Sequence, residues 1–251
     1  MKRVIRNAAV GAGALVLTLV AAVPASAQVV HSVGFGAGVF FPKSCLQSAS
    51  TNLKCRAARG TDDVLVEDLN SLAFSIKDFR GATGFGEWNI TFDDRVELSF
   101  GAGYYKKTVP SVYRDFVDID LTEIEQDLQL RVIPVSAVVR FLPIGEAGDV
   151  QPYIGGGVAA LNWKYSETGE FVDFDNNNTI FEDHFVESGT VLAPVALVGL
   201  RMPINGDVYA LNAELRYQWG KGKTGGLENG FLAEKINLGG LNFTLGFQIR
   251  F

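Results

Sequence analysis

Histidine is scarce in this chain of 251 residues, which contains only His31 and His184. A Ser-His-acid nucleophile therefore has few possible bases. His184 is near Ser188 in an expected loop, but no strained nucleophile turn or oxyanion-hole motif accompanies it. His31 is expected in a solvated N-terminal tail. We therefore expect no catalytic residue, no cofactor and no enzymatic activity.

Cysteine is equally scarce, and the two residues, Cys45 and Cys55, are close in sequence. Two thiols without nearby histidine disfavour a metal site, and the oxygen-rich segment 173–183 lacks EF-hand spacing. We expect no bound metal. In a secreted protein the two cysteines would meet an oxidising compartment, so we predict a disulfide, worth about 2–3 kcal/mol.

Basic residues do not predominate, because 22 lysines and arginines face 28 acidic residues. Nucleic acid is therefore an unexpected partner. The first residues of the chain are basic. An apolar run over 8–23 follows them, and small residues occupy 25–27. This pattern predicts a signal peptide over 1–27, cleaved between Ala27 and Gln28, and a single domain over 28–251. A signal anchor is the alternative.

Long apolar runs are absent beyond that segment, so any membrane crossing would be made by strands. Period-two alternation predicts strands in eight places: residues 33–41, 82–92, 96–106, 128–142, 152–165, 190–202, 208–220 and 241–251. Short turns near Asp94, Gly148 and Gly206 alternate with four longer segments. These are predicted loops at residues 42–79, 107–124, 166–189 and 220–238, the first with a short helix at 62–72.

The alternation places polar residues on one face and apolar residues on the other. On 208–220, for example, Glu214 and Arg216 alternate with Leu215 and Tyr217. A polar interior and an apolar exterior are typical of a barrel in lipid. The phase changes within 128–142, which predicts a β-bulge at Ile133-Pro134. The aromatic residues expected outside, as interfacial girdles, are Trp163, Tyr165, Tyr217, Trp219 and Phe251.

Eight charged residues are expected to point inward and pair across a filled lumen, because the interior of an eight-stranded barrel is just wide enough for its own side chains. They are Glu87, Glu97, Arg131, Arg140, Lys164, Glu214, Arg216 and Arg250. In 152–165, Asn162 and Lys164 are placed inside.

The last residues alternate towards a terminal aromatic, with Phe243, Leu245, Phe247, Ile249 and Phe251 on one face. This pattern resembles the C-terminal assembly signal of bacterial outer-membrane barrels. The similarity extends to RVELSFGAGYYKKTVPSVY at 95–113, LRVIPVSAVVRFLP at 130–143 and QPYIGGGVAALNWKYSETGEFVDF at 151–174. With these segments the chain resembles the small eight-stranded outer-membrane β-barrels of the OmpA-like, OmpX-like and OmpW-like group.

The resemblance implies an all-β, eight-stranded antiparallel up-and-down transmembrane β-barrel in the bacterial outer membrane. Its implied partners are outer-membrane lipid, lipopolysaccharide, periplasmic chaperones and the barrel assembly machinery. The expected function is a structural or surface-interaction role. The alternatives are a narrow channel for small solutes or ions, a lipid-modifying enzyme of the outer leaflet, and a soluble lipocalin-like barrel.

Overall fold

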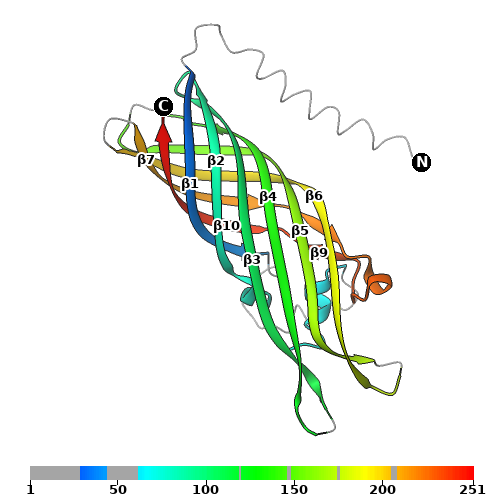
Figure 1. The fold of residues 1–251 in the computed structure, drawn as a ribbon. Coiled ribbons are helices and arrows are strands. Elements are labelled where there is room, and N and C mark those ends of the chain that lie inside the picture. The colour runs from blue at the N-terminus through cyan, green and yellow to red at the C-terminus, as the bar shows by residue number, and fades with distance from the viewer. Residues whose placement is uncertain (1–28, 44–61, 119, 146–147, 174–175, 205–207) are drawn as a thin grey trace, which may run out of the picture.

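The computed structural model describes residues 29–43, 62–118, 120–145, 148–173, 176–204 and 208–251. Eight long antiparallel strands form a closed barrel in the order β1-β10-β7-β6-β5-β4-β3-β2 (Figure 1). Their bounds are β1 Val29–Pro42, β2 Gly81–Phe92, β3 Val96–Val117, β4 Glu123–Phe141, β5 Gln151–Asp173, β6 Thr179–Ile204, β7 Tyr209–Gln218 and β10 Gly240–Arg250. The predicted fold class and all eight predicted strand positions are confirmed.

β1 closes the barrel, because Val33 pairs with Trp88 of β2 on one side and with Ile249 of β10 on the other. The tight turn between β2 and β3 forms as predicted. Asp93 and Asp94 both adopt positive φ, of 49° and 56°, which matches the right-handed twist of the strands they join. We call the end of the barrel with this turn and with Phe251 the turn end, and the opposite end the loop end.

The exterior of the barrel is apolar where the eight strands lie side by side. Outward side chains such as Phe35, Ile154 and Leu245 are more than half exposed. Exposing such a continuous apolar belt to water would be unfavourable in free energy, whereas it is the surface expected of a barrel that faces lipid hydrocarbon. In the described part of the chain, no helix is long and apolar enough to cross a membrane.

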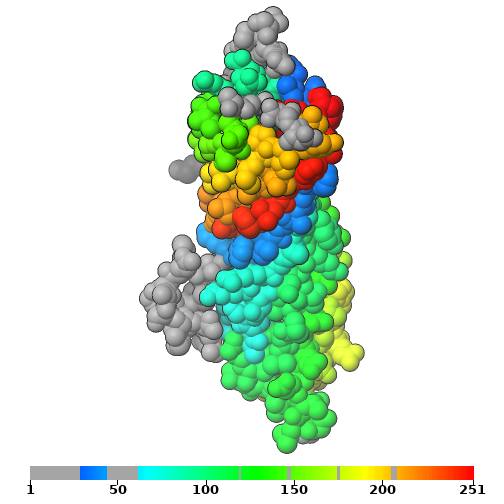
Figure 2. All heavy atoms as spheres, turned by 90° about the vertical axis from the view of Figure 1, so that its left-hand side faces the viewer, coloured from blue at the N-terminus to red at the C-terminus, as the bar shows by residue number. Residues whose placement is uncertain are grey.

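Two hairpins, β3-β4 and β5-β6, extend far past the loop-end limits of β1 and β10 (Figures 1 and 2). β5 and β6 remain paired out to Asp173 and Thr179. The prediction of loops at 107–124 and 166–189 is therefore wrong for most of their length. The sequence pattern misled because an outward polar face was not anticipated: beyond the apolar belt the outward residues contact water.

The predicted β-bulge at Ile133-Pro134 is also wrong. β4 pairs with β5 without a register shift, and its even-numbered residues keep to the inward face from Ile124 to Arg140, all of them buried except the half-buried Pro134. What changes near Pro134 is the chemistry of the interior, which is polar towards the turn end and apolar towards the loop end. Gly103 of β3 faces the proline ring, and a Cβ there would lie 3.1 Å from it, so the glycine leaves the ring its space.

The remaining elements lie at the loop end. They are α3 (Val64–Asp68), the 3₁₀ turns η1 (Ile76–Phe79) and η2 (Gly226–Asn229), and the two-stranded sheet of β8 (Lys221–Lys223) and β9 (Lys235–Asn237). α3 lies within the predicted helix at 62–72. His31 is not in a tail as expected: it belongs to β1, and its ring stacks on Trp88 and Phe251 at centroid distances of 5.8 and 6.4 Å.

Candidate functional site

Charged side chains from five strands meet inside the barrel, towards the turn end. We call this set the ionic network: Glu87 of β2, Glu97 of β3, Arg140 of β4, Arg201 of β6, and Glu214 and Arg216 of β7. Period-two geometry explains the convergence, because each residue lies on the inward face of its strand. Three carboxylates face three guanidinium groups, so the formal charges cancel.

Arg140 is the centre of the ionic network. One guanidinium nitrogen, Nη2, lies 2.7 Å from Oε2 of Glu87 and 2.7 Å from Oε2 of Glu214, while Nη1 lies 3.0 Å from Oε1 of Glu97. Nη1 also donates to Oδ1 of Asn89 at 3.1 Å. The side chain is 2% exposed. A single cation from β4 thus joins strands β2, β3 and β7 across the lumen.

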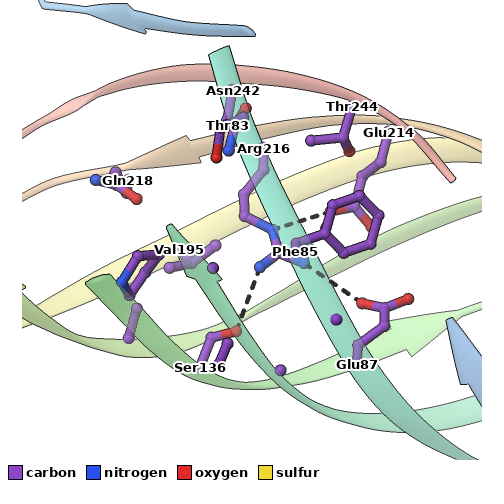
Figure 3. A pocket seen from close by; sticks show the side chains of 16 residues that line it. Thr83, Phe85, Glu87, Ser136, Val195, Glu214, Arg216, Gln218, Asn242 and Thr244 are labelled. Atoms are coloured by element: carbon purple, nitrogen blue, oxygen red, sulfur yellow. Dashed lines mark hydrogen bonds and ion pairs between the residues drawn. The ribbon is translucent and has the colours of Figure 1, made fainter. Parts of the chain in front are cut away.

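The other two arginines complete the pairing. Nη2 of Arg201 lies 2.6 Å from Oε2 of Glu97. Arg216 bonds Glu214 through Nε and Nη2, both at 2.9 Å, and its Nη1 donates to Oγ of Ser136 at 3.3 Å (Figure 3). Charge-assisted pairs of this kind are tolerated in a dry interior only when each member has a partner. The ionic network is therefore a neutral set of ion pairs that connects strands across the lumen and fills this half of it.

A small cavity of about 30 Å³ lies beside Arg216, with polar side chains around it (Figure 3). Among those lining it are Thr83, Ser136, Gln218, Asn242 and Thr244. A cavity must hold roughly 10–15 Å³ for one water molecule, so this one suits a very few waters and no organic ligand.

The half of the interior towards the loop end is an apolar core. Its members include Leu128, Leu130 and Val132 of β4, Leu161, Trp163 and Tyr165 of β5, Val64, Leu65 and Val66 of α3, and Phe231, Ile236 and Leu238 near β9. Trp163 is 2% exposed and Tyr165 is fully buried. The assignment of these two aromatics to outer girdles is therefore wrong. Trp219 and Phe251, in contrast, are exposed as predicted.

A pair of buried carboxyl groups connects α3 to the wall of this core. The hydroxyl of Tyr165 donates to Oδ2 of Asp68 at 3.1 Å, and Glu167 lies on the same inward face of β5 two residues further on. Asp68 is 1% exposed and Glu167 is 6% exposed. Burial raises the pKa of the Asp68 carboxyl well above its usual range, and the nearby charge of Glu167 raises it further.

We expect this raised pKa to make the docking of α3 dependent on pH. A carboxyl whose pKa is higher in the folded state contributes fully below its ordinary value, and that contribution falls as pH rises towards the folded value. Protection of the α3 amides from hydrogen exchange should fall with rising pH, by about tenfold for each unit of pKa elevation. D68N should remove most of this dependence.

D62N is the matched control for D68N, because Asp62 is exposed and pairs with Lys235 at 2.6 Å. That pairing lowers the pKa of Asp62, so its titration acts in the opposite direction. Protection of α3 that is independent of pH in the wild-type chain would contradict the assignment.

The structure brings together five of the eight predicted lumen charges: Glu87, Glu97, Arg140, Glu214 and Arg216. Arg250 lies on the inward face of β10 at the turn end and, with Arg201, lines a separate small cavity. The inward placement of Arg131 and Lys164 is wrong, because both lie in the outward phase of their strands. In the strand predicted at 152–165, the assignment of inward and outward side chains was the reverse of what the structure shows: Trp163 points inward, and Asn162 and Lys164 point outward.

Sequence reasoning missed Arg201, although it follows Leu197 and Gly199 in strict alternation. That signal was available. The apolar side chains of the C-terminal pattern face outward as predicted, from Phe243 to Phe251. Cys45, Cys55, Ala27 and Gln28 lie outside the described residues.

No family model matches the chain, and no curated protein matches its sequence. Solved structures do match. The outer membrane protein OprG from Pseudomonas aeruginosa aligns with a TM-score of 0.51 at 10% identity, over 90% of this chain and 97% of that one. Neisserial surface protein A aligns at 0.42 and 14% identity over 90% and 99%, and the N-terminal barrel domain of Pseudomonas aeruginosa OprF at 0.38 and 14% over 90% and 100%.

The agreement with OprG concerns the fold, since so low an identity transfers no activity. It covers almost the full length of both chains, which matches the closed ring of eight antiparallel strands found here. The chain has the fold of the small eight-stranded outer-membrane β-barrels, the class that OmpA-like and OmpX-like barrels represent.

Proposed function

We propose that this protein is an integral outer-membrane barrel with a structural or surface-interaction role, a closed lumen and no enzymatic activity. The single observation that carries the closed lumen is the ionic network, in which Arg140 reaches carboxylates on three other strands. The apolar belt supports placement in lipid, with the turn end in the periplasm and the long hairpins outside the cell.

The partners proposed for biogenesis follow from the same placement. They are a signal peptidase acting between Ala27 and Gln28, periplasmic chaperones, and the barrel assembly machinery reading the strand that ends at Phe251. Outer-membrane lipid and lipopolysaccharide would surround the mature barrel. No extracellular ligand is proposed.

Heat-modifiability tests the placement directly. The full chain, expressed in a Gram-negative host, should occur in the outer-membrane fraction and migrate differently on a denaturing gel before and after boiling. Recovery in the soluble periplasm without a shift would refute the membrane assignment and favour the lipocalin-like alternative.

A narrow channel is the main alternative function, and conductance measurements in planar bilayers test it. The reconstituted chain should give no unitary conductance steps, because the ionic network and the apolar core close the lumen in series. A variant lacking residues 62–79 should also stay silent, since the ionic network remains in place. Steps from the wild-type chain would establish a channel. Steps from the deletion variant alone would show that the segment around α3, and not the network, closes the barrel.

A lipid-modifying enzyme is the second alternative function, and the positions of His184 and Ser188 argue against it. Both lie exposed on the outward face of β6, about 13 Å apart at 3.3 Å per residue, and the His184 ring bonds to Thr168. A serine nucleophile and its base need direct hydrogen-bond contact. Lipid-modifying activity that disappears in H184A would overturn the proposal that the chain is not an enzyme.

A further inference from the structure

Three cationic side chains, one each on β3, β4 and β5, form a row on the outer surface of the barrel. These three strands are neighbours in the barrel (Figure 1). Lys106 is directly opposite Arg131, and Arg131 is directly opposite Lys164. All three lie in the outward phase of their strands. We call this set the cation row. Directly opposite residues in antiparallel strands have Cβ atoms about 4.5–5.5 Å apart, so the three charges are neighbours.

The cation row has no counter-charge within the part of the chain that the structure describes. None of its nitrogens lies within 4.0 Å of a carboxylate, and the Nε of Arg131 is covered but lacks a hydrogen-bond partner. The outward neighbours on both sides are uncharged: Tyr104, Ile133 and Asn162 on one, and Thr108, Gln129 and Ser166 on the other. Like charges directly opposite one another destabilise a sheet. An anion bound across the row would offset this repulsion.

The height of the cation row on the barrel identifies the kind of anion. On β4 the outward residues are apolar from Phe141 to Ile133 and become polar from Arg131 onward. The apolar stretch is about 26 Å long, or about 20 Å high once the strand is tilted, which is close to the thickness of the apolar band of a membrane barrel. The row therefore lies where the hydrocarbon ends, on the side of the long hairpins. The charged groups of the surrounding medium at that depth are lipid headgroups.

We propose that the cation row of Lys106, Arg131 and Lys164 binds the phosphate groups of an outer-leaflet lipid. The inference rests on the proposed membrane placement. Arg131 supplies a planar fork that matches two phosphate oxygens, while the flexible lysines on either side reach up from the belt. A lipid carrying more than one phosphate on a single headgroup fits three adjacent cations better than a single phosphate does.

The test measures binding of purified diphosphorylated lipid A to the folded chain in neutral detergent, for example by native mass spectrometry. The triple variant K106Q/R131Q/K164Q should bind it about 100-fold more weakly, since each of the three basic residues contributes about fivefold. The control K77Q/K221Q/K223Q makes the same change in net charge at exposed positions away from the belt, and should bind like the wild type. Phosphatidylethanolamine should not distinguish the three proteins.

Two further readouts keep the outcome clear. In detergent without lipid the triple variant should unfold at the same urea concentration as the wild type or a higher one, because the repulsion within the row is removed. Inorganic phosphate should compete only weakly. Equal binding by the triple variant, equal losses in both variants, or equal affinity for free phosphate would each overturn the lipid site. If the chain does not enter the outer membrane at all, the proposed function fails first, whereas normal insertion with unchanged lipid binding refutes the cation row alone.

Discussion

R140M should lower the free energy of unfolding by about 3–5 kcal/mol, because it leaves three buried carboxylates facing only two arginines. Glu87, Glu97 and Glu214 would each lose a charge-assisted bond of 2.7–3.0 Å, and the two remaining arginines are already bonded to Glu97 and Glu214. The methionine side chain has a similar volume, so the loss is electrostatic and not a cavity effect. Urea titration of the detergent-folded barrel, followed by the heat-dependent gel shift, measures it.

R95Q is the matched control for R140M, because Arg95 is an exposed arginine in the β2-β3 turn and should change stability by less than about 0.5 kcal/mol. The double variant R140M/E214Q should recover part of the loss, since it restores equal numbers of positive and negative groups. R140M with wild-type stability would mean that the ionic network does not connect the strands as proposed here. Failure of the double variant to recover would instead show that Glu214 is held independently by Arg216.

The sequence was sufficient to predict the barrel because alternation in the belt has a single cause. Each outward residue there contacts lipid and each inward one contacts other side chains, so Glu97, Glu214 and their apolar neighbours separate cleanly. Arg140 was identified by the same rule. That the carboxylates of β2, β3 and β7 all reach this one arginine depends on the stagger of the strands, which the alternation alone does not encode.

The rule that apolar residues point outward failed beyond the belt, because the outward residues there no longer contact lipid. On β5, Asn162 and Lys164 are polar because water or headgroups surround them outside, while Trp163 is inside because the loop-end segments build an apolar core. Alternation of polar and apolar residues therefore predicts a strand, but it does not show which of the two faces points into the barrel. Only the height of a residue relative to the membrane decides which face is which, and the sequence carries no marker of height. The apparent change of phase at Pro134 is the level at which the two regimes meet.

W163A tests whether Trp163 points into the barrel, and we expect it to lower the stability strongly. Trp163 packs against Gly222, where a Cβ would lie 2.4 Å from the indole ring, so the side chain is enclosed by β8 as well as by the barrel wall. Removing a buried tryptophan should cost about 3–5 kcal/mol. The loss should fall on the loop-end core and not on the belt, because the ionic network lies in the other half of the lumen.

We therefore expect W163A to make the segments around α3 and β9 sensitive to protease while the boiling-dependent gel shift remains. N162A is the matched control: Asn162 is the adjacent residue on the same strand, points outward and donates only an exposed hydrogen bond to Thr190. It should leave the protease pattern unchanged. The reverse result, a mild W163A and a severe N162A, would mean that the strand faces lipid with its aromatic side, as a girdle would. Because the two positions are consecutive, their comparison isolates the direction of the side chain from every other property of the strand.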